Sequence, residues 1–413
     1  MNNKSDIIIV GGGAAGFFTA INLAENNPDL KIIIFERSSE VLTKVKISGG
    51  GRCNLTHAEF IPKELTQNYP RGKKELLGPF HTFMTGDTME WFEKRGVPLK
   101  IEEDGRIFPE SNTSQSIIDC FLSETKKLGI EVLKNYSVKK IKKEKEAWII
   151  TTEKGDFNSD KLVITTGSNA KVWKLVEDLG HKIIPPVPSL FTFNIQDSRI
   201  KNLPGIATQA SVKVISKNKN SLESEGALLI THWGLSGPAI LKLSAWGARD
   251  LSELGYQFKI KVNWLLDISE EDAFEKLKNL KEIHSKQTIF KYAQLEVPKR
   301  LWQSLLTASG IEETQKWAET TNKQLQKIAN QLTQMIFQVN GKSTFKDEFV
   351  TAGGIDLKEI NFKNYQSKLH NNLYFAGEVL NIDAITGGFN FQNAWTGAYI
   401  VAKSISDSGS SPE

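Results

Sequence analysis

Three glycines close to the start of the sequence have the spacing of a dinucleotide-binding turn. Gly11, Gly13 and Gly16 form a GxGxxG pattern between an apolar run and a helix-like segment. Glycines at these places permit a tight turn, a close approach of the backbone to a pyrophosphate, and close packing of the helix on the strand. The N-terminus of the helix then attracts the diphosphate charge. The pattern therefore predicts a dinucleotide site.

An acidic residue indicates which dinucleotide is favoured. Glu36 follows Gly16 by 20 residues and ends the next predicted strand. A carboxylate in this place can accept hydrogen bonds from both hydroxyls of an adenosine ribose, and it would repel a 2′-phosphate. FAD or NAD is therefore preferred to NADP. A phosphate-binding P-loop is excluded, because Phe17 and Phe18 follow the last glycine where that motif needs a lysine.

A segment near the C-terminus favours a flavin. Gly377 and Glu378 follow the apolar run 373–376 and offer a polar partner for a ribityl chain, although without a flavin they would form an ordinary surface turn. Gly388 leads into the last predicted helix, whose N-terminal amides could face the ring edge that becomes negative on reduction. The sequence has no second GxGxxG, so NAD(P)H, if it is used, would enter the same cleft transiently. FAD is the predicted cofactor.

The first 40 residues predict the βαβ unit that must position the glycine turn. Residues 7–10, and residues 31–35 after Lys31, are apolar and rich in β-branched residues, which is typical of strands buried between helices in a parallel sheet. Residues 130–164 predict a small antiparallel layer that returns to this sheet. The strand, turn and helix pattern returns after about residue 345. Both ends of the chain are therefore expected to build one α/β nucleotide domain.

The middle of the chain has the pattern of a separate module. Three prolines in residues 183–189 are incompatible with a helix or a central strand and suggest a boundary. Beyond them the pattern is β-rich, then helical, and then a return strand. The predicted boundaries are 1–190 and 345–413 for a two-part FAD-binding domain with a disordered tail from about 406, and 191–344 for an inserted module, divided into β-rich residues 191–267, helical residues 268–333 and the return strand 334–344.

Composition and charge exclude several classes of protein. The 413 residues carry a net charge of +4 that is spread along the sequence, so no basic stripe of a nucleic-acid-binding surface is expected. Cys53 and Cys120 cannot build a disulfide framework or a structural zinc site. No uncharged apolar run is long enough to span a bilayer, and the N-terminus lacks a signal-peptide pattern. We expect a cytoplasmic protein with no metal, no membrane partner and no nucleic-acid partner.

Four longer motifs resemble a known family. They are the stretches 44–56 (KVKISGGGRCNLT), 231–238 (THWGLSGP), 351–355 (TAGGI) and 375–395, and together they resemble the HI0933-like or BaiN-like bacterial flavoproteins over essentially the whole chain. The resemblance implies an FAD-dependent, NAD(P)-linked oxidoreductase with aminoacetone-oxidase-type relatives. It also implies a two-part Rossmann-like FAD-binding domain with an inserted β-barrel plus helical module.

The same resemblance assigns roles to individual residues. Arg37 and Lys44 would lie near the adenosine and the phosphates, and Thr166 with Gly167 matches the second glycine turn of two-part FAD domains. Family members usually carry a TGDG stretch after that turn. Here residues 168–173 lead directly into a helix, which puts any substrate or nicotinamide contact made there in doubt. The implied cofactor-binding residues are Gly11, Gly13, Ala14, Ala15, Gly16, Glu36, Arg37, Lys44, Gly51, Arg52, Cys53, Asn54, Val138, Thr166, Gly167, Gly377, Glu378, Gly388, Asn390 and Phe391.

Arg52 and His232 are the candidate catalytic residues. The Arg52 guanidinium could stabilise a reduced flavin or an anionic substrate, or it could have a structural role. His232 could donate a proton beside the flavin, but a histidine that completes a strand end is the favoured interpretation, because no acidic residue lies near it in the sequence. Cys53 has no neighbouring cysteine, so packing or flavin contact is expected of it rather than a disulfide relay.

Three functions are compatible with these residues. The leading one is an FAD-dependent oxidoreductase that acts on a small organic substrate by hydride transfer, with NAD(P)H as a transient reductant or with oxygen as acceptor. The second is a non-catalytic or redox-sensing FAD-binding protein. The third is a tRNA-modifying flavoprotein, which is disfavoured because the predicted insert shows no clustering of basic and aromatic residues.

Overall fold

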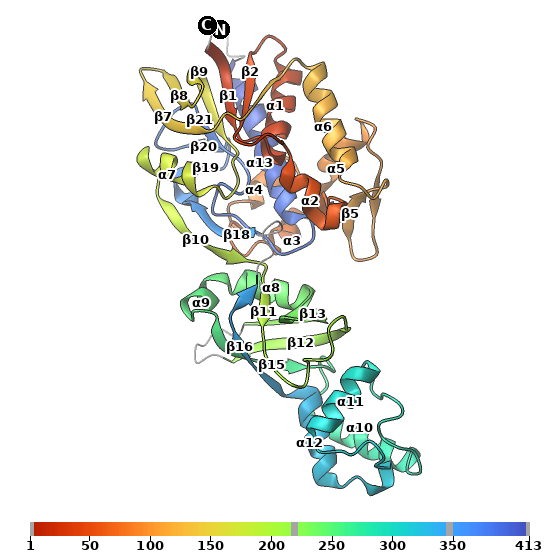
Figure 1. Cartoon of the computed structure of the whole chain (residues 1–413). Coiled ribbons are helices and arrows are strands. Elements are labelled where there is room, and N and C mark those ends of the chain that lie inside the picture. Colours follow the sequence, from red (N-terminus) through yellow and green to blue (C-terminus); the bar gives the residue numbers. More distant parts are fainter. Residues whose placement is uncertain (1–3, 216–221, 344–349, 410–413) are drawn as a thin grey trace. The chain divides into compact units, whose positions relative to one another are not determined.

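The computed structural model describes residues 4–215, 222–343 and 350–409, and it divides the chain into two compact units (Figure 1). The first unit comprises residues 1–187 and 346–413, and the second comprises residues 188–345. Each unit has its own hydrophobic core. The exact end of the predicted insert at residue 344 lies outside the described residues.

A nine-stranded sheet forms the centre of the first unit. Its main order is β19-β20-β21-β9-β1-β2-β6, and β7 and β8 extend from β9 as antiparallel hairpin partners. The pairs β1–β2, β1–β9, β2–β6 and β9–β21 are parallel, which confirms the predicted parallel α/β sheet. The strands are β1 (Lys4–Val10), β2 (Ile32–Glu36), β6 (Glu131–Lys134), β7 (Val138–Glu144), β8 (Ala147–Thr152), β9 (Gly155–Ile164), β19 (Ile360–Asn361), β20 (Gln366–Ser367) and β21 (Leu373–Phe375).

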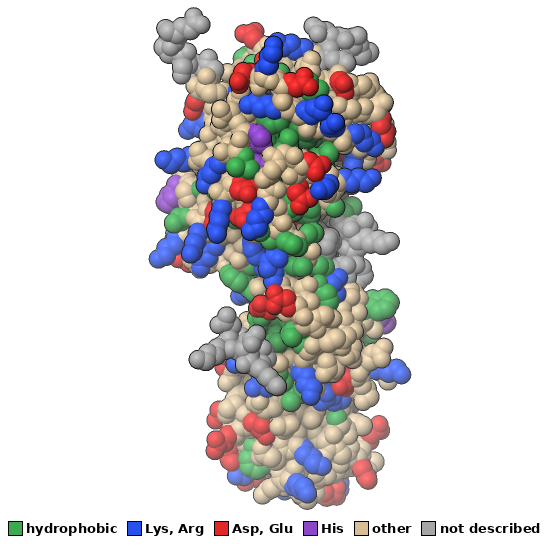
Figure 2. Space-filling view, turned by 90° about the vertical axis from the view of Figure 1, so that its left-hand side faces the viewer, with side chains coloured by type: hydrophobic (Ala, Val, Ile, Leu, Met, Phe, Trp, Pro, Cys, Tyr) green, Lys and Arg blue, Asp and Glu red, His purple; other side chains and the backbone are tan. Residues whose placement is uncertain are grey.

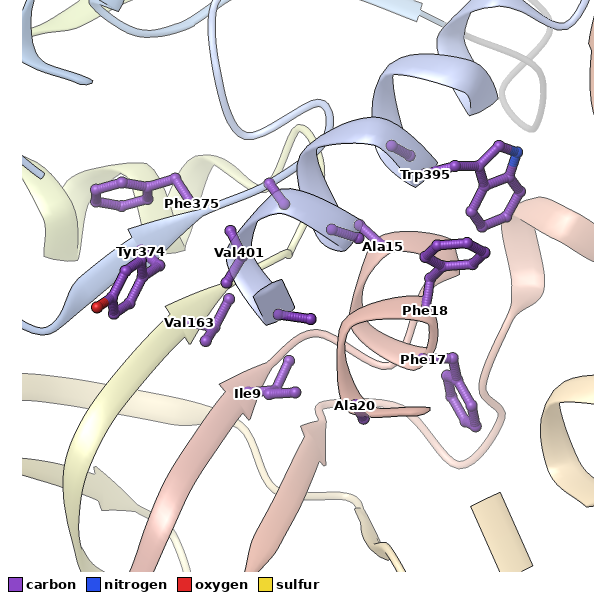
Figure 3. Packing of buried hydrophobic residues seen from close by; sticks show 14 of the residues in the cluster. Ile9, Ala15, Phe17, Phe18, Ala20, Val163, Tyr374, Phe375, Trp395 and Val401 are labelled. Atoms are coloured by element: carbon purple, nitrogen blue, oxygen red, sulfur yellow. The ribbon is translucent and has the colours of Figure 1, made fainter. Parts of the chain in front are cut away.

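Helices from both ends of the chain pack together on this sheet. The long helix α13 (Phe389–Gly409) lies against α1 (Ala14–Asn26), and Figure 3 shows Phe18 of α1 next to Trp395 of α13, with ring centroids 5.3 Å apart. The other helices of this unit are α2 (Thr43–Gly51), α3 (Pro62–Thr66), α4 (Leu77–Phe80), α5 (Thr85–Glu93), α6 (Gln115–Lys127), α7 (Ala170–Asp178) and the 3-10 turn η2 (Leu357–Glu359).

One prediction about the C-terminus is wrong. The tail was expected to be disordered from about residue 406, but α13 continues to Gly409. Ser406 explains the difference, because its hydroxyl donates to the Ala402 carbonyl (3.0 Å) and accepts from the Asn27 side-chain amide (2.5 Å). Ser406 is here held by a contact from the other end of the chain.

Two small sheets complete the first unit. The proline-rich segment forms β10 (Ile183–Ser189), which pairs with β18 (Val350–Ile355) in a two-stranded sheet. This placement agrees with the expectation that the prolines exclude a helix or a central strand, since proline is tolerated at sheet edges. The second small sheet has the order β3-β5-β4, with β3 (Thr56–His57), β4 (Leu99–Ile101) and β5 (Arg106–Pro109).

The second unit is built on a seven-stranded antiparallel sheet with the order β16-β15-β12-β13-β14-β11-β17. The two end strands of this order are separated in the chain only by Gly341, whose N–H donates to Tyr256 and whose carbonyl accepts from the Asn194 N–H. The sheet therefore closes into the predicted barrel through Gly341. Its strands are β11 (Thr192–Asn194), β12 (Ala207–Ile215), β13 (Glu223–Ile230), β14 (Gly234–Ser236), β15 (Gln257–Asn263), β16 (Met335–Asn340) and β17 (Lys342–Ser343).

The helices of the second unit follow the predicted pattern. Ser269 caps α10, because its hydroxyl accepts from the Asp272 N–H (3.0 Å). Two further helices bury the leucines of their apolar faces. The bounds are α8 (Pro238–Trp246), α9 (Ala248–Glu253), α10 (Glu270–Ile283), α11 (Lys299–Ala308), the 3-10 turn η1 (Trp317–Glu319) and α12 (Asn322–Thr333). Within the described ranges, no helix is long and apolar enough to cross a membrane.

Candidate functional site

The turn between β1 and α1 has the shape that a diphosphate needs. The Gly11 N–H donates to the Phe35 carbonyl (2.8 Å) and ties the turn to the end of β2. Helix α1 begins at Ala14, and the residue before it, Gly13, has no side chain that could accept a hydrogen bond from the first N–H groups of the helix. These N–H groups can therefore donate to an anion. A Cβ on Gly16 would lie 2.0 Å from the Gly11 carbonyl oxygen, whereas a Cβ on Gly13 would meet no described atom within 4 Å. The turn is therefore tightly packed at Gly16 and has free space at Gly13, where a diphosphate could approach the backbone.

Glu36 lies beside this turn with a fixed carboxylate. Its Oε2 accepts from the Gly12 N–H (3.0 Å), and its Oε1 accepts from the N–H (2.8 Å) and the hydroxyl (2.6 Å) of Ser38. Each oxygen retains acceptor capacity for a ribose hydroxyl. The Tyr136 N–H donates to the Glu36 carbonyl (2.8 Å), which ties the segment before β7 to the end of β2. Val138, the half-buried first residue of β7, follows Tyr136 by two residues. The geometry suits the adenosine end of a dinucleotide.

Substitution of Glu36 by arginine is expected to lower the FAD content of the purified protein at least about tenfold, because a donor replaces the carboxylate acceptor of charge-assisted hydrogen bonds. The measurement is the ratio of flavin to protein absorbance after gel filtration. Glu40→Arg is the matched control, since Glu40 is an exposed acid of the same segment that lies 3.7 Å from Lys46. The neighbouring residue Arg37 is also exposed. A fully yellow Glu36→Arg protein would refute the assigned role.

Three segments that are distant in the sequence meet at Glu378. The Lys44 Nζ lies 2.6 Å from the Glu378 carboxylate and 3.5 Å from the Ser168 hydroxyl. The other carboxylate oxygen accepts from the Thr351 N–H (3.1 Å). A Cβ on Gly167 would lie 3.5 Å from the same carboxylate. The structure thus brings Lys44, Gly167 and Glu378 together, as the sequence-based set of site residues requires.

Thr166 supplies a test of whether these residues fit a ligand. Its hydroxyl is buried and has no hydrogen-bond partner among the described residues. The neighbouring Thr165 hydroxyl donates to the Gly11 carbonyl (3.0 Å), so Thr166 lies next to the diphosphate turn. A Cβ on Gly377 would lie 3.3 Å from the Ala15 side chain, so the second glycine turn also meets the start of α1. A buried hydroxyl without a partner is unfavourable, and an oxygen of FAD would satisfy it. The residues present therefore fit FAD.

A glycine loop and the start of α13 form the other end of the site. Helix α2 is kinked at Ser48, and Gly49–Gly51 have φ angles of 57°, 67° and 83°. A Cβ on Gly50 would meet no atom of the described chain within 4 Å. The Asn54 amide, with its oxygen turned towards Gly388, accepts from that residue's N–H at 3.1 Å. The loop and the turn before α13 are thereby joined next to open space.

Asn390 and Phe391 lie in the first turn of α13. The Asn390 side-chain oxygen accepts from the Ala384 N–H (3.0 Å), and its amide donates to the Ala384 carbonyl (3.1 Å). Phe391 is half-buried and stacks on Trp395, with ring centroids 5.4 Å apart and an interplanar angle of 7°. The Asn390 contacts tie the start of the helix to the loop before it, whereas the Phe391–Trp395 stack lies within α13. Both side chains therefore have partners within the protein.

The predicted catalytic residues differ in their surroundings. The Arg52 guanidinium lies 2.7 Å from Glu102 and 3.9 Å above the ring centroid of Phe108, which favours the structural role left open by the sequence. Cys53 is fully buried, and burial raises the pKa of its thiol to about 12, so the thiol stays protonated and serves packing. His232 lies in the second unit, in an exposed turn between β13 and β14.

His57 is a site residue that the sequence interpretation missed. It directly follows the stretch 44–56, and this position was the available signal. Its Nδ1 lies 3.2 Å from the Gly387 carbonyl, and its ring packs on Phe389 with centroids 4.7 Å apart. A Cβ on Gly105 would lie 2.7 Å from its Nε2. Burial lowers the pKa of His57, so the ring is neutral near pH 7. It joins β3 to the two loops that contain Gly105 and Gly387.

Comparison with known sequences places this geometry in a family. The HI0933-like protein Rossmann domain matches residues 5–404. The chain is 27% identical to the ribosomal RNA dihydrouridine synthase of Haemophilus influenzae, covering 98% of this chain and 100% of the relative. It is 24% identical to the 3-dehydro-bile acid delta(4,6)-reductase of Clostridium scindens, covering 97% of this chain and 98% of the relative. The ribosomal RNA dihydrouridine synthase of Escherichia coli is 26% identical, over 97% and 98% of the two chains.

Solved structures share the fold. A flavocytochrome c3 fumarate reductase matches with a TM-score of 0.52 and 14% identity, over 99% of this chain and 79% of its own. A 3-ketosteroid-delta4-(5alpha)-dehydrogenase from Rhodococcus jostii matches with a TM-score of 0.50 and 10% identity, over 97% of both chains. The match of the family domain to almost the whole chain confirms the resemblance read from the motifs. The chain therefore belongs to the HI0933-like family and has the fold of FAD-dependent oxidoreductases.

Proposed function

We propose that this chain is an FAD-dependent reductase that adds a hydride to a carbon–carbon double bond conjugated with a carbonyl group. The Clostridium scindens relative is named for the reduction of such bonds in a 3-oxo steroid. The two other relatives are named for the formation of dihydrouridine, the uridine whose ring double bond, conjugated with a carbonyl, has been saturated. One reaction type accounts for all three names.

The observation that carries the proposal is the open turn over Gly13 with the fixed carboxylate of Glu36 beside it. When bound there, FAD supplies hydride transfer, so the protein needs no side-chain nucleophile. The chain's own residues bind and orient the cofactor: residues 1–190 and 345–413 act as the FAD-binding domain, and residues 191–344 act as the inserted module. The roles of the individual residues are those given for the predicted set, with Arg52 and Cys53 reassigned to structural roles.

The source of the hydride is a nicotinamide that binds transiently. Reduction of the double bond consumes one hydride and one proton, and NAD(P)H leaves as NAD(P)+, so the reaction balances. A separate, permanent site for NAD(P)H would be expected to have its own glycine-rich dinucleotide turn, and the sequence contains no second GxGxxG pattern. NAD(P)H and substrate therefore use the same cleft in turn.

The sequence predicted only a small organic substrate, and within this proposal the substrate is either a small conjugated carbonyl compound or a uridine in RNA. The second candidate is favoured by two relatives with that printed activity, which are 27% and 26% identical to this chain over essentially its whole length. It differs from the sequence-based expectation of no nucleic-acid partner. On the face of the first unit shown in Figure 2, lysine and arginine side chains are interspersed with acidic ones, so the overall charge of that face decides neither candidate.

An anaerobic titration tests the proposal. NADH or NADPH is expected to bleach the visible flavin absorbance of the purified protein. Addition of cyclohexenone, a 4-ene-3-oxosteroid or an unmodified ribosomal RNA transcript is then expected to restore it, with a product that is heavier by two hydrogens. If no nicotinamide bleaches the protein and none of the acceptors re-oxidises it after chemical reduction, the non-catalytic FAD-binding alternative replaces this proposal.

A further inference from the structure

The second unit carries an exposed tryptophan on the rim of an open hollow. The hollow has a volume of about 600 Å³ and is lined by the C-terminal end of β13 and the following turn, together with Pro204, Gly205 and Arg300. Trp233 lies in this turn with 59% of its surface exposed. A large aromatic side chain left in water forgoes the free energy of its burial, so a fixed and exposed indole is typical of a contact surface.

The turn holds Trp233 in place. The Thr231 hydroxyl accepts from the N–H groups of Trp233 and Gly234, both at 3.2 Å. The Thr231 N–H in turn donates to the Gly234 carbonyl at 2.8 Å. A Cβ on Gly234 would lie 2.2 Å from the Phe193 carbonyl, so the turn is also packed tightly against β11. The backbone of the turn is therefore held in place, and it presents the indole from a defined point of the second unit.

The lining of the hollow suits a ligand that has both a planar ring and a negatively charged group. Its lining includes the apolar residues Leu229 and Ile230. Arg300 and His232 also line it, and no acidic residue is among the described lining residues. One Arg300 nitrogen donates to the Asn202 carbonyl, which orients the guanidinium and leaves further N–H groups for an anion. An aromatic platform with a nearby guanidinium is the combination by which proteins bind unpaired nucleotides.

We propose that this hollow binds an unpaired nucleotide of an RNA chain, with a base stacked on Trp233 and a phosphate on Arg300. The inference rests on the proposed reductase and names RNA as its substrate class. The sequence alone did not suggest it, because Trp233 and Arg300 are far apart in the chain and only the structure shows that they line the same hollow.

The test uses the FAD-loaded protein and a fluorescein-labelled, unstructured, uridine-rich RNA oligonucleotide, with binding followed by fluorescence anisotropy. Trp233→Ala is expected to weaken binding about fivefold or more, and Trp233→Phe less than that, because phenylalanine keeps a ring for stacking. Arg300→Gln is expected to weaken binding and to reduce the dependence of the affinity on salt by about one counterion. Trp246→Ala is the matched control, since Trp246 is 42% exposed on α8 of the same unit.

The result that overturns the inference is RNA affinity that is undetectable in the wild type or unchanged in Trp233→Ala. Equal losses in Trp233→Ala and Trp246→Ala also overturn it, because they indicate non-specific contact. FAD content and melting temperature, measured for each variant, separate loss of binding from loss of fold. If cyclohexenone is reduced but RNA is not bound, only the nucleotide site fails. If RNA binding depends on Trp233 but no conjugated carbonyl is reduced, only the proposed reductase fails.

Discussion

Replacement of Gly13 by alanine is expected to abolish FAD binding while the protein keeps its fold. Gly13 has φ −99° and ψ −167°, which alanine adopts without strain, and a Cβ there would meet no described atom within 4 Å. That free space is where the pyrophosphate must approach the backbone of the turn, so an added methyl group excludes it. We expect the affinity for FAD to fall at least about a hundredfold, which corresponds to about 2.7 kcal/mol.

Gly16→Ala provides the contrast that makes this result specific. Its Cβ would lie 2.0 Å from the Gly11 carbonyl and 2.9 Å from the Thr165 hydroxyl, so the strand and the helix would have to separate. We expect a loss of about 3 kcal/mol or more in the stability of the FAD-free protein, since overpacking of this kind cannot relax locally. Gly86→Ala in α5 is the control, because its Cβ also meets no described atom within 4 Å.

Calorimetry of the FAD-free proteins and titration with FAD together decide between these outcomes. For Gly13→Ala the melting temperature should match the wild type and no FAD should bind at micromolar concentration. For Gly16→Ala the melting temperature should fall. For Gly86→Ala the affinity for FAD should not change and the melting temperature should not fall, because alanine favours the helix at an unstrained position. A Gly13→Ala protein that binds FAD as the wild type does would show that the diphosphate lies elsewhere.

The sequence predicted the FAD-binding sheet because its signals are local. The buried strands β1 and β2, the glycine turn and Glu36 lie within the first 36 residues, and each has a pattern that needs no knowledge of distant contacts. The closure of the second unit into a barrel rested on the family resemblance alone. The reason is that closure depends on hydrogen bonds of Gly341 to residues that are distant in the sequence.

The parts of the site that escaped prediction depend on pairs of distant residues. Arg52 was open to two interpretations until Glu102 and Phe108 were found to hold its guanidinium. His57 drew no notice because its partner, Gly387, is 330 positions away. Ser406 was assigned to a disordered tail because the contact that orders it comes from Asn27. In each case the residue type was visible, and the partner that fixes its role was not.

Arg71→Met is expected to destabilise the first unit by about 3–5 kcal/mol, because it removes the guanidinium that donates to a fully buried carboxylate. The guanidinium of Arg71 donates to both carboxylate oxygens of Asp383, whose side chain is fully buried, while 14% of the Arg71 side chain is exposed. The same two residues form an isolated β-bridge. This pair ties the segment after α3 to the loop that leads from β21 into α13.

The location of this pair extends the expected effect to the cofactor. Asp383 lies between Glu378 and Gly388, so loosening of the loop displaces both ends of the C-terminal part of the site. FAD content should therefore fall together with the melting temperature in Arg71→Met. Lys139→Met is the control, since Lys139 and Glu153 form an exposed pair at 2.6 Å, and such pairs contribute less than about 1 kcal/mol. Equal melting temperatures for the two variants would mean that the Asp383 carboxylate is compensated without Arg71, and the loop would then be held mainly by its packing.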